Sequence, residues 1–466
     1  MVAPPVTSAE LDDIQGLVAR GYPDLRAASY IVLRVEDAAM ARAWLSTLLP
    51  QVTPAPAHPT DFALNLAFTA GGLAAIGLQD NVVSQFSNQF TAGMTTPHRR
   101  RMFGDIGSSA PETWSWGGPN TPDPHLLLLL FGRDTTTVAE RYAQLSASFG
   151  GVSELVRLDA FTDLDGKEHF GFADGISQPT IEGISGRQDT PPNTIRLGEF
   201  VLGYLNEYGQ YTDRPLVDNA GGFNPLPSDV QGSGRADFGR NGTYLVFRQL
   251  AQDVRGFWRY LASVSDDPQH RTWLAAHMVG RWPSGAPVTL SPDVDNAQLA
   301  TANDFTYQYS DAFGLSCPIG AHVRRSHPRD SLDPAPGTAG SVELDKRHRL
   351  LRRGREYGPP VPPDSLYSDP PANDPERGLF FICIGANIGR QFEFVQHSWV
   401  NNAKFDELYD EPDPLVGYHP PGANNFSIPQ DPVRLRLRNL PQFVTTKGGA
   451  YFFLPSLRAL QYLSAG

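Results

Sequence analysis

An apolar run from Leu126 to Phe131 constrains the fold more than any other feature of the sequence, and no apolar run is longer. Its six residues are far short of the ~20 that a helix needs to cross a bilayer, and they are too few for a buried helix. The run is followed by Gly132. It therefore predicts a short strand in a protein core, and it argues against a membrane partner.

The residues around this strand follow a regular order of predicted elements. β-Branched, aromatic and alternating residues indicate strands, and an Ala-rich stretch after Asp37 indicates a helix. The predicted elements are a strand over 28–35, a helix over 37–49, strands over 62–69 and 125–132, a helix over 134–149 and a strand over 151–160. This order, with a long irregular insertion before the third strand, is that of a ferredoxin-like βαββαβ module.

The second half of the chain predicts the same order less clearly. Strands are expected over 242–250, 379–385 and 450–455, and helices over 251–266 and near 388–400. The second strand is poorly marked, and we place it near 304–309; the stretch from 326 to 376, rich in Pro, Asp and Arg, is expected to be a long ordered excursion. The predicted fold class is α+β, with two ferredoxin-like modules and long loop insertions.

A cluster of Gly, Pro and Ser near 225–235 marks the predicted boundary between the modules. We therefore expect an N-terminal domain over residues 1–230 and a C-terminal domain over 231–466. The two cysteines, Cys317 and Cys383, are too few and too far apart for a disulfide framework, so we expect buried free thiols.

The charge of the chain limits its partners. The net charge of −12 at pH 7 argues against nucleic acid, because binding phosphates needs a basic surface. The first twenty residues lack the basic and apolar segments of a signal peptide. This predicts a cytoplasmic protein, or a secreted one if a leader was removed upstream.

Motifs for hydrolases, nucleotide-binding enzymes and zinc or calcium sites are missing from the sequence. Three segments remain as candidates for chemistry: residues 169–179, 317–330 and 347–360. In the first, glycines hold Asp174 in a tight loop, where the proton affinity of a carboxylate would matter, although such a turn is often only structural.

The other two segments also allow two interpretations each. His322 follows a small apolar turn and is either an ordinary histidine or a haem ligand, because a haem iron needs only one imidazole from the protein. The basic segment is either a solvated face or the source of one inward-pointing arginine, which would require an anionic partner. His327, the histidine nearest to His322, is expected to point to another side of the helix.

These segments, in this order, resemble the dye-decolorizing peroxidase family. The resemblance rests on the GxxDG loop at 171–175, the GAH segment at 320–322 and the RxLRR segment at 349–353, and it extends over nearly the whole chain. The long excursion after His322 is similar to the subclass of this family with larger loops. The resemblance implies two ferredoxin-like modules of the dimeric α/β-barrel type, with haem b held mainly by the second.

The resemblance also implies roles for single residues. His322 would be the axial ligand of the haem iron, Asp174 the distal acid and base, and Arg352 the distal cation. Arg352 is preferred to Arg353 because the family's arginine follows an aliphatic pair. Leu379 and Phe381, which alternate on one predicted strand, would form the apolar distal wall. The group that holds the other nitrogen of His322 is not identifiable from the sequence.

The implied function is a haem peroxidase that uses hydrogen peroxide to oxidise bulky dyes and phenolic compounds in one-electron steps. Surface aromatic residues would carry electrons from substrates too large to enter. Trp399 is the first candidate, although a tryptophan packed in the core is the more common interpretation of such a residue. Two alternatives stay open: a haem carrier or sensor, and another haem enzyme on a related α+β barrel. The sequence leaves the oligomeric state and the physiological substrate undetermined.

Overall fold

In the computed structural model, which describes residues 8–161, 164–184, 189–218, 224–420, 422 and 424–465, the leucine-rich run forms strand β3 (Leu126–Gly132). Leu126, Leu128 and Leu130 pack into one core, whereas Leu127, Leu129 and Phe131 pack into another, and all six are 0% exposed. Side chains alternate between the faces of a strand, so an all-apolar run requires a sheet that is covered on both faces.

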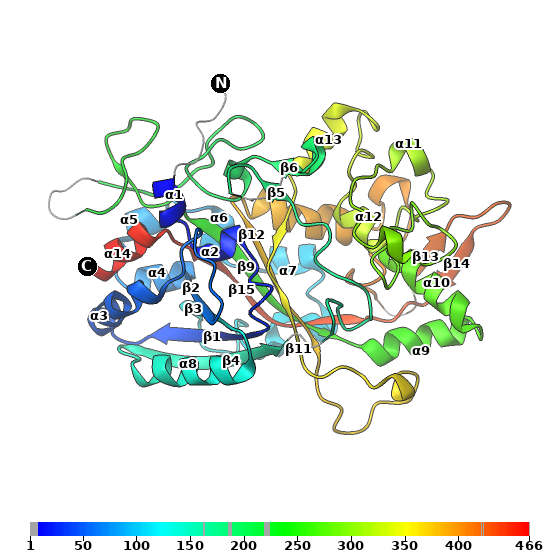
Figure 1. Ribbon diagram of the computed structural model, residues 1–466, viewed down its shortest axis with the longest axis horizontal. Coiled ribbons are helices and arrows are strands. Elements are labelled where there is room, and N and C mark those ends of the chain that lie inside the picture. The colour runs from blue at the N-terminus through cyan, green and yellow to red at the C-terminus, as the bar shows by residue number, and fades with distance from the viewer. Residues whose placement is uncertain are drawn as a thin grey trace.

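The N-terminal module has the predicted order. Its elements are β1 (Ala27–Val35), α3 (Ala38–Leu48), β2 (Phe62–Phe68), β3, α8 (Thr135–Ala147) and β4 (Val152–Phe161). Both helices begin after an aspartate whose side chain accepts a backbone N–H: Asp37 from Met40, and Asp134 from Thr137. Figure 1 shows these helices beside the strands at the end of the molecule where β1 to β4 lie.

The C-terminal module contains β9 (Thr243–Gln252), α9 (Val254–Val264), β12 (Gly378–Gly385) and β15 (Val444–Leu454). The predicted helix near 388–400 is present as π-helical segments over Gly389–Glu393 and Val395–Val400. The two cysteines are free and buried, as expected.

The predicted strand near 304–309 is wrong. The second strand of the module is formed instead by β10 (Leu351–Arg352) and β11 (Arg355–Tyr357), both paired with β12, within the stretch expected to be an excursion. These pieces, separated by Gly354, are too short to show an alternating pattern. The aromatic content of 304–309 reflects packing, since Tyr307 is buried and Arg324 lies 4.6 Å from the centre of its ring.

The two modules share one antiparallel sheet in the order β10–β12–β9–β15–β2–β3–β1–β4, with β11 also paired to β12. Each half has the same strand order, and Phe453 of β15 pairs with Phe68 of β2 where the halves meet. At the two ends of the sheet, β11 and β4 lie against each other, so the sheet curls around the core that contains Tyr30, Phe247 and Phe380. We propose that the module boundary lies between β4 and β9, near residue 230.

The remaining segments surround this sheet. The other helices are α1 (Ser8–Asp13), α2 (Gly16–Ala19), α4 (Ala70–Ala75), α5 (Asp80–Val83), α6 (Asn88–Ala92), α7 (Pro97–Phe103), α10 (Pro268–Val279), α11 (Gln308–Asp311), α12 (His322–Ser326), α13 (Ala339–Lys346) and α14 (Leu457–Ala465). The small strands are β5 (Thr180–Ile181), β6 (Thr194–Ile195), β7 (Leu216–Val217), β8 (Ala236–Asp237), β13 (Asn425–Ile428) and β14 (Leu435–Arg438). Among the described residues, none of the helices has both the length and the apolar character to cross a bilayer.

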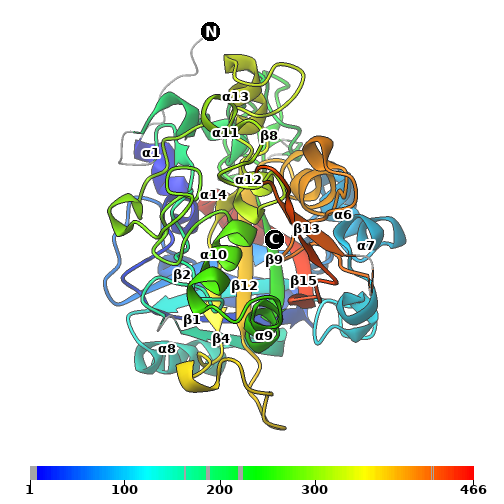
Figure 2. The same ribbon diagram turned by 90° about the vertical axis from the view of Figure 1, so that its right-hand side faces the viewer.

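Helices α9, α10 and α12 lie over the C-terminal half of the sheet, in front of β9, β12 and β15 in Figure 2. A third apolar core fills the space around α9 and α10, and it includes Phe257, Leu274 and Phe426. The space between α12 and the outer face of the sheet is only partly filled by side chains.

Candidate active site

A cavity of about 290 Å³ lies between α12 and the outer face of β10, β12, β9 and β15. Neighbouring strands are ~4.8 Å apart, so four of them form a wall roughly 14 Å wide. Leu379 and Phe381 of β12 both line this wall, because alternate residues of a strand share a face. Phe380, which lies between these two residues, and Ile382, which follows them, point into the core on the other face of the sheet.

His322 is the first residue of α12, and it lines the cavity opposite the sheet. Its Nδ1 lies 2.8 Å from Oδ2 of Asp413, which is 0% exposed. The backbone N–H groups of Leu415 and Val416 donate to Oδ1 of the same carboxylate, at 2.9 and 3.0 Å. Asp413 is therefore the partner of His322 that the sequence left unidentified.

The His322–Asp413 pair leaves one ring nitrogen available. Burial favours neutral imidazole, but Asp413 outweighs this effect and raises the pKa of His322. Burial also acts to raise the pKa of Asp413, yet the imidazole and the backbone donors hold it below its ordinary value. An ionised Asp413 accepts a hydrogen bond from Nδ1–H, so the lone pair of Nε2 is free to bind a metal.

Asp174, on the loop between β4 and β5, and Arg352 lie next to each other in the lining of the cavity. Nη2 of Arg352 is 3.4 Å from Oδ1 of Asp174, and the backbone N–H of Gly175 donates to the same oxygen at 2.6 Å. Arg352 is on β10, and its backbone N–H donates to Oε1 of Gln178 at 3.0 Å, which ties the strand to the loop. Arg353 points elsewhere, because its guanidinium donates to the carbonyls of Leu17 and Val18.

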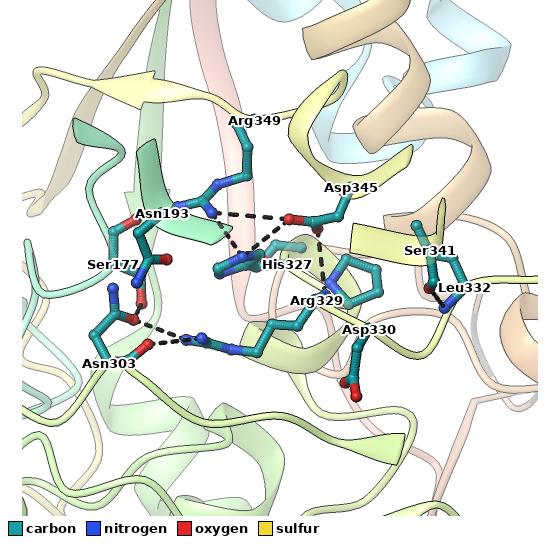
Figure 3. A network of polar contacts seen from close by, with 12 residues as sticks. Ser177, Asn193, Asn303, His327, Arg329, Asp330, Leu332, Ser341, Asp345 and Arg349 are labelled. Atoms are coloured by element: carbon teal, nitrogen blue, oxygen red, sulfur yellow. Dashed lines mark hydrogen bonds and ion pairs between the residues drawn. The ribbon is translucent and has the colours of Figure 1, made fainter. Parts of the chain in front are cut away.

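Figure 3 shows a network of basic and polar side chains, of which Ser177, His327 and Arg349 line the cavity. Nε2 of His327 lies 2.8 Å from Nη1 of Arg349 and 3.1 Å from Oδ2 of Asp345, while Arg329 donates to Oδ1 of Asn303 at 2.7 Å. Burial, assisted by Arg349, lowers the pKa of His327 to about 3, so its ring is neutral. The sequence missed this network, because its members come from separate segments.

These residues fit the haem that the sequence resemblance implies. The cavity offers one imidazole with a free nitrogen, an apolar wall for the macrocycle, and Arg281 and Arg349 as cations for its carboxylates. Nδ1 of His327 is buried and has no hydrogen-bond partner within the described residues. Such a group requires a partner, and a ligand in the cavity would supply one. No group of three or more potential metal-ligating side chains occurs in the described ranges.

Replacing Asp413 by Asn is expected to weaken haem binding by ~10–100-fold, the usual effect of removing a carboxylate behind a ligating histidine. The amide still fills the space, but it no longer compels Nδ1 to carry the proton, and it removes the negative charge beside the ring. Titration of haem-free protein with haemin measures the affinity. Asp410→Asn, which changes a more exposed carboxylate three residues away, is the control and should bind haem like the unmodified protein. Equal affinities in all three proteins would contradict this role.

Trp399 lies in the core, so the structure agrees with a packed tryptophan and not with a surface electron carrier at this position. It is 5% exposed, and its ring packs edge-on against His348 and Phe394, with centroids 5.2 and 5.4 Å away. Its segment forms the π-helical turn from Val395 to Val400, which directs the indole into a small core with Val395 and Phe405.

No family model matches the chain. The chain is 31% identical to "Peroxidase 2" of Mycetinis scorodonius, over 97% of this chain and 87% of that protein. It is 30% identical to "Dye-decolorizing peroxidase msp1" of the same organism, with the same coverage. Its structure is similar to the crystal structure of a DyP-type peroxidase from Auricularia auricula-judae, with a TM-score of 0.79, 27% identity and coverage of 98% of this chain and 100% of that one.

Proposed function

Since the chain belongs to the dye-decolorizing peroxidase family and is a peroxidase, we propose that it binds haem b in this cavity and uses hydrogen peroxide to oxidise bulky dyes and phenolic compounds in one-electron steps. The observation that carries the proposal is that one cavity holds His322, backed by a buried carboxylate, opposite an apolar wall of strands that bears Arg352, with the loop residue Asp174 beside this arginine. In this proposal His322 would bind the haem iron, and Leu379 and Phe381 would form the apolar wall against the haem.

The bound haem would supply the redox centre that gives two electrons to hydrogen peroxide and later regains them one at a time from the substrate. Asp174 acts as the base that takes the proton from the inner oxygen and as the acid that returns it to the departing oxygen. Arg352, next to this carboxylate, places a fixed positive charge where negative charge develops. The N–H of Gly175 holds the Asp174 carboxylate in orientation.

An absorption spectrum of the haem-reconstituted protein, recorded before and after adding peroxide, tests the function. We expect a Soret band that shifts with peroxide and returns when a dye or a phenol is added. The absence of a Soret band after reconstitution would overturn the proposal. A Soret band that does not respond to peroxide would also overturn it, in favour of a haem carrier or sensor.

We expect oxidation of anionic dyes to be fastest in acid, roughly between pH 3 and pH 5, because carboxylates as a class stay ionised at acidities that protonate imidazole. The net charge of −12 acts in the same direction, since it repels anionic dyes near neutrality. Steady-state rates for an anionic and a neutral substrate measure both effects, and added salt should partly restore oxidation of the anionic dye at neutral pH. An optimum above pH ~7 for both substrates would contradict a carboxylate base.

A further inference from the structure

An exposed tyrosine lies at the tip of a tight turn over residues 205–211. Tyr208 is 47% exposed, and Gly209 follows it with a φ of 69°. Oδ1 of Asn206 accepts the backbone N–H groups of Tyr208 and Gln210, at 2.9 and 3.2 Å. These bonds order the turn, which presents a large aromatic side chain to solvent where turns usually carry small or polar residues.

Two arginines from the C-terminal half of the chain lie against this ring. The guanidinium carbons of Arg347 and Arg390 are 4.2 and 5.2 Å from the ring centre of Tyr208. The ring attracts cations, which keeps both guanidinium groups beside the tyrosine. We call these three residues the Tyr208 patch, in which an exposed aromatic surface adjoins two positive charges.

A buried carboxylate, that of Glu199, fixes the geometry of the Tyr208 patch. It is 0% exposed, its Oε1 accepts the backbone N–H of Glu207 at 2.9 Å, and its Oε2 accepts from Nη2 of Arg390. The turn and one of the two arginines are thus held by the same group. A site that is ordered before its ligand arrives loses less entropy on binding than a mobile one.

Arg347 is the cation of the patch that is available to a ligand. Among the described residues it has no ion-pair partner, and its Nε is buried without a hydrogen bond. Arg390 pairs with Glu199, and Arg196, on the same turn, pairs with Glu207. The side chains of these two carboxylates are 0% and 11% exposed, so the arginines carry most of the exposed charge here. An anion therefore gains an ion pair at this patch, although the whole chain has a net charge of −12.

The Tyr208 patch is connected to the lining of the cavity. Arg347 is two residues from Arg349, Arg390 is two residues from Phe392, and both of these neighbours line the cavity. Nε2 of Gln391 also donates to the carbonyl of Arg349 at 3.0 Å. A molecule on the patch would thus lie outside the cavity but close to the residues that enclose it, which suits a substrate too large to enter.

We propose that Tyr208, Arg347 and Arg390 form a docking site for anionic aromatic substrates, and that aromatic sulfonates are the class that fits it. The sulfonate accepts hydrogen bonds from guanidinium, and the aromatic rings contact the exposed part of the tyrosine. A sulfonate also stays ionised in acid, where a carboxylate becomes protonated. This inference rests on the proposed function, because only a peroxidase that oxidises dyes makes such a compound a substrate.

Binding of anthraquinone-2-sulfonate to the haem-loaded protein tests the docking site. This probe is anionic, aromatic and already oxidised, so it reports binding without turnover. In equilibrium dialysis, Arg347→Gln and Tyr208→Ser should each weaken its binding by ~fivefold, about the upper value for a partly exposed ion pair and a usual value for an aromatic contact. The uncharged analogue 2-(hydroxymethyl)anthraquinone should lose less affinity than the sulfonate in Arg347→Gln.

Arg271→Gln is the matched control, because Arg271 lies 5.1 Å from the ring centre of another exposed tyrosine, Tyr367. Its guanidinium already donates to the carbonyls of Ser265 and Asp266, and its replacement removes the same single charge. This variant should bind the probe like the unmodified protein. Equal affinities in all the proteins would overturn the docking site. Equal weakening in Arg271→Gln and Arg347→Gln would also overturn it, since that result reports only net charge.

Steady-state kinetics separate this inference from the proposed function. The KM for a sulfonated dye should rise ~fivefold in Arg347→Gln, with a smaller rise for an uncharged phenol. Turnover of both substrates, with equal probe affinity in every variant, would contradict the docking site alone. The expected differences in probe affinity without any peroxide reaction would contradict the proposed function and support the docking site.

Discussion

Replacing Asp174 by Asn is expected to slow the reaction with hydrogen peroxide by ~10²–10⁴-fold, the usual value of general acid–base catalysis. The amide has nearly the same size and can still accept the Gly175 N–H, so the loop and haem binding should be unchanged. It cannot take or return a proton. Arg352→Leu removes the neighbouring positive charge and should slow the same step while haem still binds.

Stopped-flow mixing of the haem-loaded variants with peroxide measures the rate of the spectral change. Asp165→Asn is a suitable control, since Asp165 is exposed on the same segment nine residues before Asp174. It should react like the unmodified protein. Unchanged rates in both Asp174→Asn and Arg352→Leu would show that the peroxide site lies elsewhere.

Replacing His322 by Ala is expected to abolish specific haem binding and, with it, turnover. No other histidine takes its place, because His327, the nearest in sequence, has its Nε2 in contact with Arg349 and Asp345. The neutral ring of His327 lies at the edge of the cavity. The variant should lack the normal Soret band after reconstitution, with circular dichroism showing that the fold persists.

The control for this variant is His397→Ala, which changes an exposed imidazole. It should bind haem and react with peroxide normally. A normal Soret band together with full turnover in His322→Ala would mean that another residue is the axial ligand.

Local patterns in the sequence were sufficient for most of the fold. The run Leu126 to Phe131 predicts a core strand because six apolar residues are too few for a buried helix, and β3 confirms it. The caps at Asp37 and Asp134 act within one helical turn, so both helix starts were visible. The loop motif around Asp174 and the GAH segment were likewise local, and they led to the correct family.

The tertiary structure alone decided which distant residues meet. Asp413 is 91 residues from His322 in the sequence. Its own segment has no feature that distinguishes it from a solvent-exposed aspartate, and only the fold brings it into contact with the imidazole. Arg352 and Arg353 are neighbours in sequence, but the pairing of β10 with β12 directs one to the cavity and the other to Leu17. The burial of Trp399 arises in the same way. A single sequence records local preferences, whereas these contacts depend on how far-separated segments pack, and that is determined only when the whole chain has folded.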